Sequence, residues 1–166
     1  MEAINKRRSI RTFKDLKVEK EKIEKLLRAA MQAPSAYNQQ AWEFIVIEDK
    51  KSLKELSEMS QYSKMIKDSA VTIIILGNKE KMVVPECWQQ DLGAATQNLL
   101  LEAVELDLGG VWMAGAPFDD RMTFIKDMFN LPQNILPYSV VSVGYPKGEN
   151  KFIDRYDTNK VHYEKW

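Results

Sequence analysis

The stretch Leu108-Gly109-Gly110-Val111-Trp112-Met113-Ala114-Gly115 decides the fold class, because it joins a long helix to a strand. Residues 86–108 carry the longest helical pattern, and the glycines that follow stand where the end of a helix favours a left-handed residue. A Gly-x-Gly-x-x-Gly dinucleotide motif has the reverse order, since it follows a strand and opens a helix. We therefore predict no such motif. We interpret Gly109 as a helix cap and Gly115 as a point of close backbone approach to a ligand.

Further strands and helices are predicted on both sides of this stretch. Residues 70–76 are apolar and rich in β-branched side chains, which is typical of a central strand covered on both faces. Residues 44–47 and 138–144 predict two more strands. Apolar residues recur at helical spacing in residues 17–32, which indicates an amphipathic helix. Strands mixed with longer helices predict an α+β or α/β domain.

Composition narrows the functional classes. The 166 residues suggest one domain, and 45% hydrophobic with 29% charged residues indicates a soluble globular chain. Lys+Arg and Asp+Glu are both 24, so the basic excess typical of nucleic-acid binding is absent. One cysteine and one histidine disfavour a disulfide framework and a metal site. With no apolar leader and no apolar run long enough to span a bilayer, we expect a cytoplasmic protein without membrane contact.

Three further motifs can carry binding chemistry. The sequence Arg7-Arg8-Ser9-Ile10-Arg11 offers guanidinium groups that match phosphate geometry, or it is a solvated basic terminus. Residues 34–42, Pro-Ser-Ala-Tyr-Asn-Gln-Gln-Ala-Trp, offer hydroxyl and amide groups for the edge of a planar heterocycle, or they form an ordinary turn. Gly144-Tyr145-Pro146, followed by Lys151 and Arg155, can hold an anion or form a surface loop.

In their order along the chain, these motifs resemble the nitroreductase family. The pattern is Arg-Arg-Ser-x-Arg-x-Phe, Pro-Ser-x-x-Asn-x-Gln-x-Trp, a long Ala-rich helix into Leu-Gly-Gly-Val-Trp, then Gly-Tyr-Pro and a late Arg. The resemblance runs from Ile4 to about His162. It implies an α+β fold with a mostly antiparallel sheet flanked by helices, in an intertwined homodimer with flavin mononucleotide (FMN) sites at the interface. We expect residues 1–166 to be a single FMN-binding domain with a C-terminal arm at about 146–166.

The resemblance also implies site residues. Arg7, Arg8, Ser9 and Arg11 are expected to hold the phosphate, ribityl chain and pyrimidine edge of FMN, and Arg155 to reach the phosphate. The partner subunit is expected to contribute Pro34, Ser35, Asn38 and Gln40. Lys64 resembles a lysine near the flavin N1–O2 edge, and Met113, Ala114 and Gly115 resemble the segment whose backbone N–H faces N5. Ala114 departs from family members that have Glu there.

The resemblance implies an enzyme that passes hydride from NADH or NADPH through FMN to a nitroaromatic, a quinone or a related acceptor. One shared pocket for donor and acceptor predicts a ping-pong cycle. We expect no catalytic side chain and no metal, because FMN carries the chemistry. Two alternatives stay open. One is the same fold with dehalogenation or flavin fragmentation chemistry, and the other is a non-enzymatic FMN carrier or dimeric interaction module.

Overall fold

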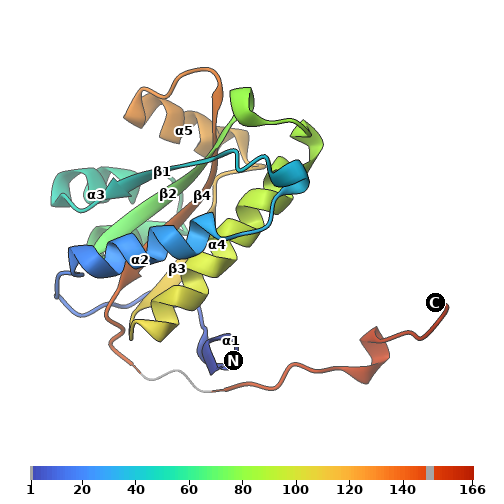
Figure 1. Cartoon of the computed structure of the whole chain (residues 1–166). Coiled ribbons are helices and arrows are strands. Elements are labelled where there is room, and N and C mark those ends of the chain that lie inside the picture. Colours follow the sequence, from blue (N-terminus) through green and yellow to red (C-terminus); the bar gives the residue numbers. More distant parts are fainter. Residues whose placement is uncertain (1, 149–151) are drawn as a thin grey trace.

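The computed structural model describes residues 2–148 and 152–166 (Figure 1). Its helices and strands are α1 (Glu2–Lys6), α2 (Lys20–Met31), η1 (Ala36–Asn38), β1 (Trp42–Ile47), α3 (Lys50–Leu56), η2 (Lys64–Asp68), β2 (Val71–Asn78), η3 (Lys79–Lys81), η4 (Pro85–Cys87), α4 (Trp88–Glu105), β3 (Gly109–Ala114), α5 (Asp119–Phe129), β4 (Ile135–Gly144) and η5 (Thr158–Lys160). The elements labelled η are short 3-10 helices. Each of the four strands overlaps a stretch that the sequence predicts as a strand.

The four strands form one sheet in the order β1-β2-β4-β3, and every neighbouring pair is antiparallel. The predicted α+β fold with an antiparallel sheet flanked by helices is therefore confirmed. Strand β2 lies inside the sheet, and residues 71–77 are buried. Strand β3 forms one edge of the sheet, which leaves half of its backbone polar groups pointing away from β4.

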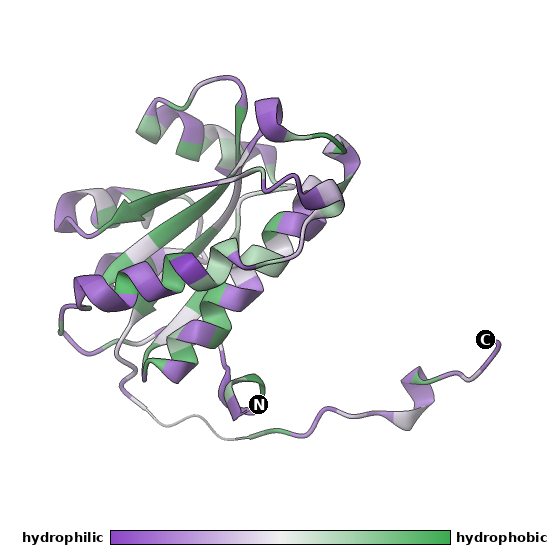
Figure 2. Ribbon diagram, in the orientation of Figure 1, coloured by the Kyte–Doolittle hydropathy of each residue, from purple (hydrophilic) through white to green (hydrophobic). Residues whose placement is uncertain are grey.

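Helices cover both faces of the sheet (Figure 1). On one face, α2 and α4 pack on strand residues that include Ile73, Ile75 and Val141. On the other face, α3, η2 and α5 pack on the alternate residues of the same strands, including Ile74 and Val140. Because side chains alternate along a strand, burial on both faces accounts for the continuous apolar sequence of the central strands, which Figure 2 shows.

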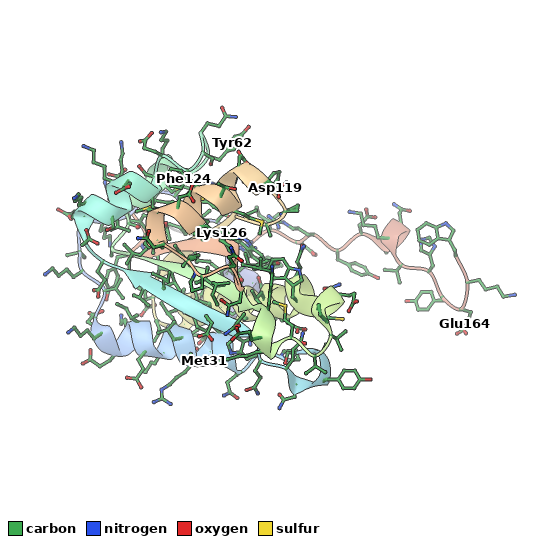
Figure 3. The ribbon with its side chains drawn as sticks, turned by 90° about the horizontal axis from the view of Figure 1, so that it is seen from above. Met31, Tyr62, Asp119, Phe124, Lys126 and Glu164 are labelled. Atoms are coloured by element: carbon green, nitrogen blue, oxygen red, sulfur yellow. The ribbon has the colours of Figure 1, made fainter. Side chains whose placement is uncertain are left out.

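Residues 152–166, here called the C-terminal arm, lead away from the body of the molecule (Figures 1 and 3). The arm contains only the short helix η5. Its larger apolar and aromatic side chains are exposed, namely Phe152, Ile153, Tyr156, Val161, Tyr163 and Trp166. The body of its own chain does not cover these side chains.

Candidate functional site

The N-terminal segment is held along the outer edge of β3 and the end of β4. Ser9 forms a parallel bridge with Gly110, and the Ile10 N–H donates to the Gly110 carbonyl at 2.9 Å. Phe13 forms an antiparallel bridge with Pro146. Backbone pairing therefore fixes the arginine motif against the sheet, and a freely solvated basic terminus is ruled out for Ser9 to Phe13.

Gly109 has a different role from the predicted helix cap. Helix α4 ends at Glu105, and the left-handed residue after it is Asp107, with φ of 60°. Gly109 lies inside β3, where an added Cβ would stand 2.5 Å from Ile10 Cγ1. Its missing side chain makes room for the N-terminal segment, so the cap interpretation was wrong. A helix C-cap is a local pattern, whereas the Ile10 contact cannot be read from neighbouring residues.

The guanidinium of Arg8 is incompletely satisfied. Its Nη1 donates to the Arg7 carbonyl at 2.6 Å. Its Nε and Nη2 atoms are buried and have no hydrogen-bond partner within residues 2–148 and 152–166. A buried charged donor without a partner costs free energy, so this group is suited to an anion. Arg7 is half-buried beside it, while Ser9 and Arg11 are exposed.

Arg155 reaches the same place from the C-terminal arm. A hollow of about 260 Å³ is lined by residues of α1, the arginine motif and the arm, namely Ile4, Asn5, Arg7, Arg8, Phe152, Ile153, Asp154 and Arg155. The structure therefore brings the late arginine together with Arg7 and Arg8, and Asp154 is the one carboxylate in this lining. Lys151, the other cation of that motif, lies outside the described residues.

Strand β3 presents backbone groups at its free edge beyond Gly110. The Gly110 carbonyl points outward to Ile10, and in an antiparallel pair every second residue has the same orientation, so Trp112 and Ala114 point outward as well. The Ala114 carbonyl accepts from Arg121 Nη1 at 3.1 Å, which agrees with this orientation. The Gly115 N–H donates to the Tyr138 carbonyl at 2.8 Å. Of Met113, Ala114 and Gly115, only Ala114 therefore directs its N–H off the sheet.

A cleft of about 470 Å³ lies along this edge, and we call it the edge cleft. It is lined by Arg11, Ser60, Gln61, Tyr62, Met65, Val111, Trp112, Met113, Ala114 and Arg121. In Figure 3, Tyr62 and Asp119, the first residue of α5, lie on one side of the molecule, and Met31 of α2 lies on the other. Residues 111–114 of β3 form one wall of the edge cleft, and Arg11 and Arg121 supply its charge.

Sequence reasoning missed Arg121. It lies in the first turn of α5, where the helix dipole disfavours a cation, and this misplaced charge was the available signal. Its guanidinium also stands 4.1 Å from the centre of the Phe118 ring. The hydrogen bond to Ala114 and the ring contact both hold Arg121 at the free edge.

Gly115 is explained by packing within the chain. An added Cβ would meet the Tyr138 carbonyl oxygen at 3.1 Å and Ile125 Cδ1 at 3.5 Å. The residue is buried, and its backbone approaches strand β4 closely. Packing against β4 and α5 therefore accounts for the missing side chain of Gly115, which the sequence had suggested made room for a ligand.

Lys64 lies in η2 and pairs with the Glu58 carboxylate. The hydrogen bond and charge of Lys64 hold the pKa of the Glu58 carboxyl below its usual value. Lys64 is outside the described lining of the edge cleft, although the adjacent Met65 belongs to it.

The loop of residues 34–40 is held rigidly by its own hydrogen bonds and by α4. Tyr37, Asn38 and Gln40 all have left-handed backbone conformations, with φ of 50°, 53° and 46°. Ser35 Oγ accepts from the Gln40 N–H at 3.1 Å, and Gln40 Nε2 donates to Asn38 Oδ1 at 2.8 Å. Non-glycine residues adopt this conformation at a cost that the surrounding contacts must offset.

Asp91 of α4 supplies the main anchor for this loop. Its carboxylate is 5% exposed and accepts from the Ala36 N–H at 3.0 Å and from Gln39 Nε2. Gln39 Oε1 in turn accepts from the Val84 N–H at 2.9 Å. Asp91 was not among the predicted site residues, and Gln39 was predicted only as one of the amide side chains of the loop. A buried carboxylate that accepts from a loop leaves no spacing pattern, so no sequence signal identified it.

The loop and the arginine motif lie at opposite ends of α4. Asp91 holds the loop near the start of the helix, and Ser9 pairs with Gly110 just beyond its end. From Asp91 to Glu105 the helix runs about 21 Å. One chain therefore does not bring Ser35, Asn38 and Gln40 together with Arg7 and Arg8.

Comparisons with known proteins identify the family. The sequence profile of the nitroreductase family matches residues 4–63 and 59–145. A Clostridium acetobutylicum protein, described provisionally as an NADH oxidase, has a solved structure with TM-score 0.97 and 56% identity, covering 99% of each chain. An Archaeoglobus fulgidus protein, described provisionally as an NADH dehydrogenase/NAD(P)H nitroreductase, is 41% identical over 100% of this chain and 98% of its own length.

A third similar protein is an FMN-dependent nitroreductase from Clostridium difficile. Its structure has TM-score 0.91 and 34% identity, covering 99% of this chain and 98% of that one. The chain belongs to the nitroreductase family. In the part of the chain that the structure describes, no helix is both long and apolar enough to cross a membrane.

Proposed function

We propose that this protein is an FMN-dependent NAD(P)H oxidoreductase of two-electron chemistry. Two observations carry the proposal: two buried nitrogens of the Arg8 guanidinium have no hydrogen-bond partner among the described residues, and the Ala114 N–H points outward from the free edge of β3. An anion and a planar heterocycle, joined in one ligand, match these two features. The family membership and the FMN-dependent relative support the same cofactor.

Each end of the cofactor has its own set of residues. We assign the phosphate to Arg7, Arg8 and Arg155, because charge-assisted hydrogen bonds suit a phosphate dianion and these three residues line one hollow, and to Ser9, which follows Arg8 in the chain. We assign the pyrimidine edge to Arg11, which lines the edge cleft. Within the segment of Met113, Ala114 and Gly115, the Ala114 N–H is assigned to N5. Lys64 is assigned to the N1–O2 edge, with Glu58 released when the cofactor binds.

The second half of the site is assigned to a partner subunit. The proposed assembly is an intertwined homodimer of one-domain chains in which Pro34, Ser35, Asn38 and Gln40 reach the partner's arginine motif. The distance along α4 supports it, because one chain holds these two sets apart. The C-terminal arm supports it as well, since its exposed aromatic side chains need a surface to cover them.

When bound, FMN supplies the redox chemistry, taking hydride from NAD(P)H and passing it to a nitroaromatic, a quinone or a related acceptor. The protein chain binds the cofactor and orients it. Arg11 and Lys64 place positive charge at the pyrimidine edge, which is electrostatic preorganisation for the negative charge that reduction brings. Ala114 fixes the position of the heterocycle through its N–H. We assign no side chain as acid or base, and donor and acceptor occupy the edge cleft in turn.

The test is anaerobic reduction of the purified holoprotein by NADH and by NADPH. We expect bound FMN to bleach with at least one donor and to regain its yellow colour on addition of a nitroaromatic or a quinone. Initial-rate plots are expected to give parallel double-reciprocal lines. Protein that rebinds no FMN contradicts the cofactor assignment, and intersecting lines contradict the shared cleft.

A further inference from the structure

Two more clefts continue from the edge cleft. The first holds about 480 Å³ and is called the cation-lined cleft; its lining is Arg11, Thr12, Phe13, Asp15, Lys50, Lys67, Asp68 and Lys147. The second holds about 630 Å³ and is called the distal cleft; its lining is Asp15, Leu16, Lys17, Glu48, Asp49, Lys50 and Ala70. Arg11 borders both the edge cleft and the cation-lined cleft, and Asp15 and Lys50 border both the cation-lined and distal clefts.

Charge is distributed unevenly along this series. The cation-lined cleft has four cations against Asp15 and Asp68. None of the four forms an ion pair with a residue that the structure describes, although six other pairs are present in the same chain. Lys50 is partly held, since its Nζ lies 3.4 Å from the Ser69 carbonyl. In a chain of zero formal net charge, this local excess of positive charge favours an anionic ligand.

The distal cleft has the opposite balance. Asp15, Glu48 and Asp49 outnumber Lys17 and Lys50 there. Asp49 is engaged as the cap of α3, accepting from the Ser52 N–H at 2.9 Å. Asp15 and Glu48 are exposed and can accept hydrogen bonds from a ligand. Leu16, which is 53% exposed, and Ala70 add apolar surface.

We infer that the edge, cation-lined and distal clefts together form the binding groove of the pyridine-nucleotide donor, and that the groove favours NADH over NADPH. The inference rests on the proposed function, which places the nicotinamide in the edge cleft. A pyridine nucleotide has a planar ring, then a pyrophosphate, then adenosine, and the groove has an apolar strand edge, then cations, then carboxylates with apolar surface. Lys67 and Lys147 bind the pyrophosphate.

The choice between the two donors follows from the distal cleft. A carboxylate accepts hydrogen bonds from the ribose hydroxyls of NADH, whereas the 2′-phosphate of NADPH meets like charge at the same place. Glu48 is the specificity residue, because Asp49 is occupied and Asp15 lies between two clefts. Lys17, which also lines the distal cleft, moderates the preference without reversing it.

The first test measures binding without any redox step. ADP-ribose carries the pyrophosphate and adenosine but no nicotinamide, so calorimetric titration of the holoprotein reports these two clefts alone. The double variant Lys67→Gln/Lys147→Gln is expected to weaken ADP-ribose by about tenfold or more. The control is Lys79→Gln, an exposed lysine beyond the other end of β2. The matching NADPH fragment, 2′-phospho-ADP-ribose, is expected to bind more weakly than ADP-ribose. The substitution Glu48→Gln is expected to reduce the difference between the two affinities.

The second test separates this inference from the proposed function. The donor 1-benzyl-1,4-dihydronicotinamide has no phosphate, so it is expected to bleach the parent and the double lysine variant equally, while the variant needs more NADH for the same rate. If the double lysine variant binds ADP-ribose as tightly as the parent, the proposed binding groove is overturned, even if NADH and NADPH both bleach the protein. Equal or tighter binding of the 2′-phosphorylated ligand overturns the preference for NADH. If neither NADH nor NADPH bleaches the holoprotein, both the proposed function and the proposed binding groove are overturned.

Discussion

The two ends of α4 are built in opposite ways. At its start, Asp91 and Gln39 satisfy the loop of residues 34–40 with hydrogen bonds, and three residues are held in left-handed conformations. At its end, the arginine motif is fixed by backbone pairing, yet the Arg8 guanidinium keeps two buried nitrogens without a described partner. One end satisfies its polar groups within the chain, and at the other end two buried donors have no partner among the described residues.

This difference indicates two halves of one kind of site. A rigid loop with exposed side chains presents groups to something outside its own chain, and buried unpaired donors receive an anion. About 21 Å of helix separates the halves within the chain. The proposed dimer, in which each loop faces the other subunit's arginine motif, would join them. Substitutions at four positions and one mixing experiment can test this difference.

The largest effect is expected at the basic end, from Arg8→Ala. The substitution removes charge-assisted hydrogen bonds to the cofactor phosphate, worth about 1.5–3 kcal/mol, so the FMN dissociation constant should rise about ten- to a hundredfold. Fluorescence titration of apoprotein with FMN measures it. Arg28→Ala is the control, since Arg28 is exposed on α2 and pairs with Glu24. Equal FMN affinity in Arg8→Ala and the parent excludes Arg8 from the site.

A second effect at the same end is expected from Gly109→Ala. The new Cβ meets Ile10 at 2.5 Å, so the N-terminal segment must shift, at a cost of about 1–3 kcal/mol for overpacking. Thermal or urea unfolding measures the loss, and FMN affinity should fall with it because the arginines move. Gly148→Ala is a matched control, where an added Cβ meets nothing within 4 Å. A stable Gly109→Ala protein with normal FMN binding disproves the positioning role of this contact.

At the loop end, Asp91→Ala should cost about 1–3 kcal/mol, because the Ala36 N–H and the Gln39 amide lose their acceptor. Asp91→Asn retains one acceptor oxygen and should cost less. In the proposed dimer the loop contributes to the partner's site, so FMN affinity should follow the same order. Urea unfolding and FMN titration of both variants measure these effects. If Asp91→Ala and Asp91→Asn weaken FMN binding to the same extent, the carboxylate acts through its charge and not as the anchor of the loop.

The smallest effect is expected from Tyr138, which packs edge-on against Trp88 near the start of α4. Burial raises the pKa of the Tyr138 hydroxyl above its usual value of 10.0. The stabilising contribution of the neutral phenol is therefore complete below about pH 10 and is lost as the pH rises through the folded-state pKa. Tyr138→Phe should flatten the alkaline fall in unfolding free energy, and Tyr163→Phe on the exposed arm should leave it unchanged. Identical pH profiles for both variants contradict this cause.

The sequence predicted those features that depend on neighbouring residues. The apolar run of β2 and the periodic pattern of α2 both follow from local alternation, and both elements are present. The interpretation of Gly109 as a helix cap was wrong, because the residue lacks a side chain to make room for Ile10, nearly a hundred residues away in the sequence. Arg121 and Asp91 were missed because their partners, Ala114 and the loop, come near only in the folded chain. The resemblance to the family nevertheless predicted a role for Arg155, and the structure places Arg155 in the same hollow as Arg7 and Arg8.

The most direct test of a site shared between chains is complementation by two defective variants. Arg8→Ala impairs the basic half and Asn38→Ala impairs the loop half, and each alone should bind FMN weakly. If the halves come from different chains, unfolding, mixing and refolding the two should restore about a quarter of the parent's tight FMN sites. Random pairing makes half the dimers mixed, and each mixed dimer has one intact site of two. Mixed protein that binds no more FMN than the separate variants would show that each site is built within one chain.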